Sequence, residues 1–150
     1  MNDDFLDLLT ALVGASARFL VVGAHALAVH GATRATEDLD VFIDRSASNA
    51  ARVWQALTDF GAPLKTIGVT LDDFARADQV VQIGVPPRRI DIMTGISGVT
   101  FDEAWSSRVI TEIGGVAVPF LGRDLLIQNK RASGRPKDLH DIETIIRGSR

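Results

Sequence analysis

The sequence has 150 residues, 46% of them apolar and 23% charged, which fits one folded domain with a single core. It contains no cysteine, which excludes a disulfide framework, a thiol nucleophile and cysteine-ligated metal sites. No apolar run is as long as a membrane helix, and the first residues are acidic rather than basic as in a signal peptide. We therefore expect a cytoplasmic protein with no membrane partner.

The charge is unevenly distributed along the chain. The net charge of −3 argues against broad, sequence-blind binding of nucleic acid. Residues 123–150 hold seven Lys/Arg against four Asp/Glu and carry +3, whereas residues 1–122 hold nine against fifteen and carry −6. A basic end that faces an acidic body would suit a metal-bound polyphosphate held between them.

The first part of the chain alternates predicted helices and strands. In chain order we expect helix 2–13, strand 18–22, helix 24–30, strand 36–44 and helix 46–60. In strand 36–44, Leu39, Val41 and Ile43 alternate with polar residues, which is typical of a strand with one face in the core.

The second part adds strands in close pairs. We expect a helical turn at 72–77, strands 79–85, 88–94, 109–113 and 116–120, and helices 101–107, 124–132 and 137–147. Gly114-Gly115 is placed to turn a hairpin, and Pro136 to open the last helix. Paired late strands favour an α/β fold of the α+β type, with a mixed sheet and helices packed on one side, over a doubly wound parallel fold.

Several familiar site motifs are missing. The sequence has no G-x-x-x-x-G-K-[ST] phosphate loop, no G-x-G-x-x-G turn, no H-E-x-x-H and no G-x-S-x-G elbow. The three histidines show no metal-ligand spacing.

The first chemical signal is an aspartate pair. Asp38 and Asp40 are two residues apart on a predicted strand, so both carboxylates point to the same face. Like charges this close repel unless a cation lies between them, and Mg²⁺ is the natural cation for such oxygen ligands. Taken alone, the pair is a weak signal, and the polar outer face of an antiparallel strand is the better interpretation of it.

A third aspartate strengthens the metal interpretation. If Ile90 and Ile92 face the core, Asp91 faces the opposite way. Should its strand neighbour that of the pair, three carboxylates would converge and could hold two divalent ions. The alternative for Asp91 is a salt bridge to Arg34 or Arg89.

Gly23-Ala24 stands where a buried strand meets a helix. Unpaired N–H groups at a helix start can bind phosphate, and glycine lets a ligand approach the backbone closely. The alternative is a tight turn that needs a glycine.

The order of these parts resembles the nucleotidyltransferase superfamily, whose members are DNA polymerase β-like. The matching parts are Gly23-Ala24, then Arg34-Ala35-Thr36-Glu37-Asp38-Leu39-Asp40, then a lone aspartate on a later strand. More narrowly, the chain resembles the small bacterial branch of abortive-infection and toxin–antitoxin nucleotidyltransferases. Its Lys130 and Arg135-Pro136-Lys137-Asp138-Leu139-His140-Asp141 are similar to the Lys-x(6–7)-Lys-Asp-x-x-Asp stretch of that branch.

The resemblance spans about 18–147 and implies one domain over 1–150, with the catalytic sheet at about 18–120 and C-terminal helices at about 122–147. It implies a Mg²⁺-dependent enzyme of the 2.7.7 type that moves a nucleoside monophosphate from ATP or another nucleoside triphosphate to a hydroxyl and releases pyrophosphate. In it Asp38 and Asp40 bind two metal ions, and Asp91 completes the second site and helps deprotonate the acceptor.

For the nucleotide, the resemblance implies five binding residues: Gly23, Ala24, Arg34, Thr36 and Lys130. The alternative for Lys130 is a solvated helix position. Asp138 and Asp141 are expected to pair with basic neighbours and to hold the last two helices together.

Other functions stay open at this point. The superfamily usually has Gly-Ser or Gly-Gly where this chain has Gly23-Ala24, so a weakly active nucleotide- or partner-binding module is one alternative, and a two-metal phosphodiesterase or nuclease is another. The acceptor could be RNA such as tRNA, a partner protein or a small molecule. A second copy of the chain, or a partner encoded nearby, could complete its site.

Overall fold

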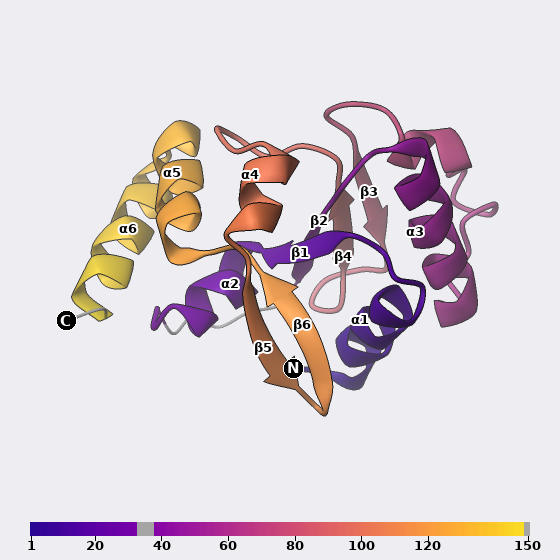
Figure 1. Cartoon of the computed structure of the whole chain (residues 1–150), viewed down its shortest axis with the longest axis horizontal. Coiled ribbons are helices and arrows are strands. Elements are labelled where there is room, and N and C mark those ends of the chain that lie inside the picture. The colour runs from indigo at the N-terminus through magenta and orange to yellow at the C-terminus, as the bar shows by residue number, and fades with distance from the viewer. Residues whose placement is uncertain (33–37, 149–150) are drawn as a thin grey trace.

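The structure is a computed structural model that describes residues 1–32 and 38–148 (Figure 1). Its elements, in chain order, are α1 (Asp3–Gly14), β1 (Phe19–Val22), α2 (Gly23–Val29), β2 (Leu39–Ile43), α3 (Ala47–Phe60), the 3₁₀ turn η1 (Leu71–Phe74), β3 (Val80–Ile83), β4 (Ile90–Met93), α4 (Phe101–Ser106), β5 (Val109–Ile113), β6 (Val116–Phe120), α5 (Arg123–Ser133) and α6 (Pro136–Gly148). None of the helices in the described ranges is long and apolar enough to cross a lipid bilayer.

The strands form one mixed six-stranded sheet in the order β3-β4-β2-β1-β6-β5. β1 is antiparallel to β2 and parallel to β6, and β2 is parallel to β4. The edge pairs β3–β4 and β5–β6 are antiparallel hairpin neighbours. This confirms a mixed α+β sheet, and it places β1, β2 and β4, the three strands that lead to the predicted site, next to one another.

Helix ends follow the capping residues in the sequence. The Asn2 side chain accepts a hydrogen bond from the Phe5 N–H at the start of α1, and Ser46 caps α3 in the same way. Gly61 ends α3 in the left-handed region with φ +92°, and Gly134 ends α5 with φ +66°. Pro136 is the first residue of α6, as its missing N–H favours.

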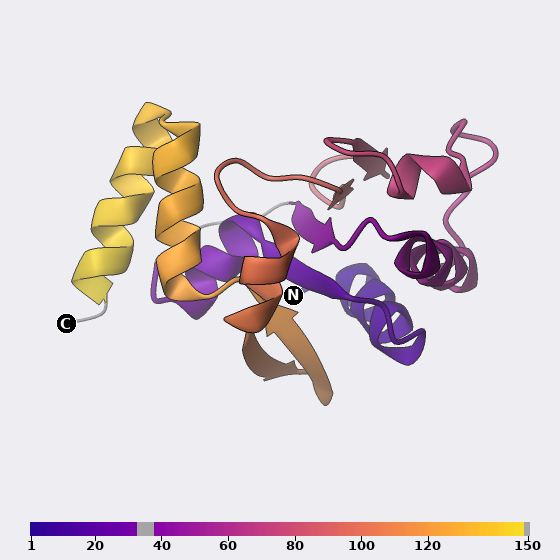
Figure 2. The same ribbon diagram turned by 45° about the horizontal axis from the view of Figure 1, so that its top comes forward.

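Helices cover both faces of the sheet, so the prediction of helices on one side is wrong. Val41 and Ile43 of β2 are completely buried on one face, and Phe42 is buried on the other, where its ring contacts Phe101 of α4. Figures 1 and 2 show α1 and α3 side by side at one side of the molecule, with α5 and α6 at the other and the sheet between them. The alternation along β2 did not indicate a second buried face, because Phe42 occupies a position that is polar elsewhere in the pattern.

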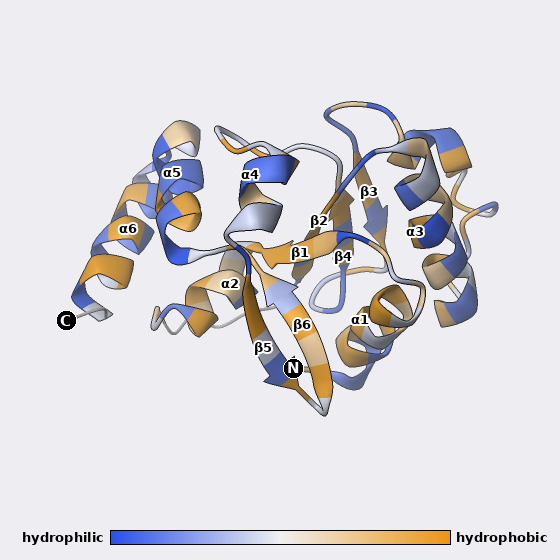
Figure 3. Ribbon diagram, viewed as in Figure 1, coloured by the Kyte–Doolittle hydropathy of each residue, from blue (hydrophilic) through white to orange (hydrophobic). Residues whose placement is uncertain are grey.

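The apolar core lies along the central strands, which are largely hydrophobic in Figure 3, while the helices present mixed faces. Every predicted helix and strand is present, with ends that differ by a few residues. The largest differences are in the strands predicted at 36–44, 79–85 and 88–94, which are each four or five residues long in the structure. Residues 36 and 37 of the first lie outside the described ranges.

Candidate active site

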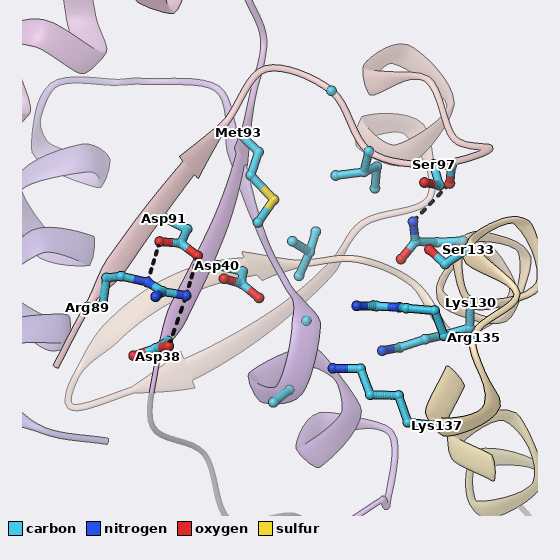
Figure 4. A pocket seen from close by; sticks show the side chains of 16 residues that line it. Asp38, Asp40, Arg89, Asp91, Met93, Ser97, Lys130, Ser133, Arg135 and Lys137 are labelled. Atoms are coloured by element: carbon cyan, nitrogen blue, oxygen red, sulfur yellow. Dashed lines mark hydrogen bonds and ion pairs between the residues drawn. The ribbon is translucent and has the colours of Figure 1, made fainter. Parts of the chain in front are cut away.

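A polar cavity of about 620 Å³ opens between the sheet and the two C-terminal helices (Figure 4). One wall comes from the end of β1, the start of α2, and strands β2 and β4; the other comes from α5 and the start of α6. The loop between β4 and α4 joins the walls, because the Gln128 and Asn129 amides of α5 donate hydrogen bonds to the carbonyls of Gly98 and Ser97, at 2.7 and 2.8 Å.

Strand register brings the three predicted carboxylates together on the sheet wall. Asp40 pairs with Val22 at the end of β1 and with Asp91 on β4, so both aspartates stand at the same level of the sheet. Asp38 precedes Asp40 by two residues and lines the same cavity. The condition attached to Asp91 at the sequence level, that β4 neighbours β2, is met.

Arg89 lies among these carboxylates. Its Nε and Nη2 donate to the two carboxylate oxygens of Asp91 at 2.9 and 3.3 Å, and Nη2 is also 3.3 Å from Oδ2 of Asp38 (Figure 4). Arg89 and Asp91 share a strand face at i and i+2, which explains the forked contact. The salt bridge foreseen for Asp91 is therefore present, together with the convergence of the carboxylates.

Asp40 has the most perturbed pKa in the cavity. Burial raises the pKa of its carboxyl to about 6, helped by the negative charges of Asp91 and Asp38. Arg89 opposes this shift but does not cancel it. A bound cation would favour the ionised form of this carboxyl, so Asp40 is chemically suited to be a cation ligand.

Gly23 is required where it stands. Its φ of +66° lies in the left-handed region, and a Cβ there would overlap Oδ2 of Asp40 and approach its Cγ to 3.1 Å. The backbone of Gly23 and Ala24 therefore comes close to the carboxylates, and both residues line the cavity. This places the predicted pair beside Asp40.

Lys130 lines the opposite wall of the cavity. The alternative given for it from the sequence, a solvated helix position, is wrong. The residue is 7% exposed, and its ammonium lies 3.3 Å from both Asp138 and Asp141 of α6. Arg135 also holds Asp138, with its Nε 2.7 Å from Oδ2. Burial raises the pKa of Asp138, but the hydrogen bonds from Arg135 and Lys130 outweigh it and the pKa is lowered. These aspartates tie α5 to α6, as expected.

Two further basic side chains complete this wall and were not among the predicted site residues. Arg135 and Lys137 line the cavity beside Lys130, and in Figure 4 all three extend toward the carboxylates. Their signal in the sequence was the +3 charge of residues 123–150, which faces an acidic body as proposed from the charge distribution. Lys137 is exposed and has no ion pair within residues 1–32 and 38–148. Two predicted nucleotide-binding residues, Arg34 and Thr36, lie outside the described residues.

The carboxylate wall fits a hard divalent cation in its donor chemistry. Oδ1 of Asp38 is buried without a hydrogen-bond partner in the described structure, and Asp40 carries no ion pair there. Oxygen donors of this kind suit Mg²⁺. In the arrangement described, however, no group of three or more acidic, histidine or cysteine side chains in residues 1–32 and 38–148 is placed to hold a metal ion. The guanidinium of Arg89 stands among the carboxylates instead.

Comparison with known families identifies the chain. Residues 4–146 match the model of a family described as nucleotidyltransferase of unknown function, DUF6036. The chain belongs to this family. The matched residues include those of both walls of the cavity.

Solved nucleotidyltransferases share the fold. A candidate nucleotidyltransferase, TM1012 from Thermotoga maritima, is similar with a TM-score of 0.62 and 14% identity, over 98% of this chain and 95% of that one. ANT(2")-Ia, solved in complex with adenylyl-2"-tobramycin, is similar with a TM-score of 0.55 and 13% identity, over 97% and 87% of the two chains. No curated protein matches the sequence.

Proposed function

We propose that the protein is a Mg²⁺-dependent enzyme that transfers a nucleoside monophosphate from a nucleoside triphosphate to an acceptor hydroxyl. The observation that carries this proposal is the pairing of walls in one cavity: Asp38, Asp40 and Asp91 on the sheet face Lys130, Arg135 and Lys137 on the helices (Figure 4). A metal-bound triphosphate has positive charge at its metal ions and negative charge at its phosphates, so it is complementary to both walls.

The carboxylate wall would hold the metal ions. Asp38 and Asp40 are assigned to Mg²⁺, with Asp91 completing a second site. Bound there, the ions would neutralise the charge that develops on the phosphate oxygens and the departing pyrophosphate. The buried, unpartnered Oδ1 of Asp38 and the raised pKa of Asp40 support this assignment, because each would be relieved by a cation.

The phosphates would be bound between Gly23-Ala24 and the basic wall. Gly23 presents no side chain to the cavity, which leaves room for a phosphate beside Asp40. Lys137 carries a charge that no other side chain in the described structure neutralises, whereas Lys130 is shared with Asp138 and Asp141. We therefore assign Lys137 and Arg135 the larger part in phosphate binding, with Lys130 contributing through the same wall. Arg34 and Thr36, which lie outside the described residues, stay proposed nucleotide-binding residues.

Transfer would then proceed as an in-line displacement. The acceptor oxygen forms a bond to the α-phosphorus while the bond between that phosphorus and the bridging oxygen breaks, and pyrophosphate carries away the electron pair. The acceptor's proton passes to Asp91 or to water. Asp91 is suited to accept it because it stands beside Asp40 on the sheet, at the level where the metal ligands lie.

The acceptor is proposed to be a hydroxyl of RNA such as tRNA, of a partner protein, or of a small molecule. The adenylyl-2"-tobramycin in the complex with ANT(2")-Ia supports including the last class. The basic wall favours an anionic acceptor, so binding should weaken as salt rises. A second copy or a separately encoded partner, as in a toxin–antitoxin pair, would supply acceptor contacts. The cytoplasm, which holds nucleotides and Mg²⁺, is the proposed location.

The test is transfer of label from each α-labelled nucleoside triphosphate in the presence of Mg²⁺. The wild type and Asp40→Asn are compared, with total RNA, cell lysate and hydroxylated small molecules offered as acceptors. Asp72→Asn is the matched control, because it removes a carboxylate whose side chain is 74% exposed. Label on a discrete product with the wild type and the control, but not with Asp40→Asn, is the expected result.

Other outcomes have defined meanings. Shortened RNA without label would replace transfer by the two-metal nuclease. Nucleotide binding without label on any acceptor would favour the weakly active module, in which Ala24 stands for the usual Ser or Gly. Absence of nucleotide binding as well would refute the assignment of the cavity to a triphosphate.

A further inference from the structure

Arg89 makes contacts that conflict with metal binding at the same carboxylates. The three aspartates offer six carboxylate oxygens, and the guanidinium of Arg89 contacts three of them: both of Asp91 and Oδ2 of Asp38. Those left are Oδ1 of Asp38, which has no partner in the described structure, and the oxygens of Asp40. A second metal ion at Asp91 would therefore have to share these oxygens with Arg89 or displace it.

The side chain of Arg89 is more open to solvent than the carboxylate that it contacts. It is 30% exposed, whereas that of Asp91 is 9% exposed. Arg89 also precedes β4 rather than lying inside it, and it lines an open cavity. Turning it away from Asp91 would break no backbone pairing along β4.

Something must hold the carboxylates while no metal is bound. Asp38, Asp40 and Asp91 line one cavity, with Asp40 directly opposite Asp91 on the neighbouring strand, so their negative charges repel one another. Arg89 supplies one positive charge that bridges two of the three aspartates from one position. A planar guanidinium is suited to this task because it pairs with a carboxylate through two parallel hydrogen bonds.

We propose that Arg89 is the internal counter-ion of the metal-free site and competes with the divalent cation for Asp38 and Asp91. It holds the carboxylates in place before metal arrives, and it sets a threshold for metal binding. This inference rests on the proposed function, because it assigns the same carboxylates to the metal. Arg89 is thus a positioning residue, which acts through the aspartates rather than on substrate.

The test measures metal affinity rather than turnover. Mn²⁺, whose free form is counted by its paramagnetic resonance signal, is titrated into the wild type, Arg89→Gln and Arg88→Gln. Arg88→Gln is the matched control because it makes the same charge change at the adjacent residue, whose side chain is 68% exposed and lies near Asp4. We expect Arg89→Gln to bind Mn²⁺ about tenfold more tightly than the wild type, and Arg88→Gln to change affinity by less than about twofold.

Thermal stability provides a second readout. Without metal, Arg89→Gln should melt at a lower temperature than the wild type, and Mn²⁺ should raise its melting temperature by more than it raises that of the wild type. Arg89→Lys keeps the positive charge but loses the two parallel hydrogen bonds of the guanidinium, so its affinity for Mn²⁺ should lie between those of the wild type and Arg89→Gln. This variant also keeps the test decisive if Arg89→Gln does not fold without metal.

The outcomes separate this inference from the proposed function. If the wild type and Arg89→Gln bind Mn²⁺ equally, or the variant binds it more weakly, Arg89 does not compete with metal and the inference is overturned while the metal site stands. If neither protein binds Mn²⁺, the metal site and the competition are both refuted. An affinity gain shared by Arg88→Gln would reduce the effect to net charge and also overturn the inference.

Discussion

Replacing Asp40 by asparagine should make the metal-free protein more stable relative to the wild type as pH rises from 4 to 8, even though it removes the proposed metal ligand. The folded protein raises the pKa of Asp40 from 3.8 to about 6, so between these values the folded state holds a proton that the unfolded state has lost. Its contribution to the free energy of unfolding is therefore highest below pH 4, falls as pH rises toward 6, and is constant above that.

The size of the effect follows from the shift. A difference of about two pKa units at about 1.4 kcal/mol each makes the ionised carboxylate cost up to about 3 kcal/mol at pH 8, and less than about 1 kcal/mol at pH 4. Asparagine does not titrate. The free energy of unfolding of Asp40→Asn relative to wild type should thus rise by about 2 kcal/mol between these two pH values.

Urea denaturation in a chelating buffer at several pH values measures this relative change, and constant effects of the substitution cancel in the comparison. For the control Asp72→Asn, which removes one side of an exposed ion pair, the free energy of unfolding relative to wild type should change by less than about 0.5 kcal/mol between pH 4 and pH 8. A flat difference between wild type and Asp40→Asn across this range would show that the carboxylate is not destabilised by its surroundings. The electrostatic support for a cation at Asp40 would then fail.

Three further substitutions test other parts of the site. Gly23→Ala should destabilise the fold by at least about 1 kcal/mol and abolish nucleotide binding, since its Cβ would meet Asp40; a variant of unchanged stability would show that the turn can relax. Lys130→Met should lower the free energy of unfolding by about 3 kcal/mol, because it leaves buried carboxylates without their shared cation; urea titration decides, and a loss within about 0.5 kcal/mol would mean that the pairs add no stability. Lys137→Met should change the free energy of unfolding by less than about 0.5 kcal/mol but weaken nucleotide binding by about tenfold in calorimetry. Lys65→Met, a control at another exposed lysine, should not weaken nucleotide binding. If Lys137→Met binds nucleotide as tightly as the wild type, Lys137 is not part of the phosphate site.

The sequence predicted the elements and the Asp38/Asp40 pair because both depend on local periodicity. Alternation along 36–44 was enough to place Asp38 and Asp40 on one face. That Asp91 joins them depended on β4 lying parallel to β2, which is a matter of pairing between distant segments and is not encoded in either strand alone.

The burial of Lys130 could not be predicted for a similar reason. Seen along α5 it is a polar helix residue, and only the return of α6, with Asp138 and Asp141, encloses its ammonium. Phe42 is the opposite case, an apolar residue on the otherwise polar face of β2. Its burial depends on the position of α4, whose Phe101 contacts it, and the pattern along β2 does not indicate that position. Such contacts between elements decide burial, whereas periodicity decides only which residues share a face.

The division of the cavity between two parts of the chain has a consequence for how relatives could diverge. The carboxylates belong to the sheet, which the core fixes, whereas the opposite charges belong to the two C-terminal helices, which follow β6 after Leu121 and Gly122. Changes at exposed residues of these helices, such as Arg135 and Lys137, can therefore alter which phosphate-bearing molecule is accommodated without disturbing the strands. Among related proteins, the sheet would then keep the residues of the reaction, while the two C-terminal helices would vary and determine which substrate binds.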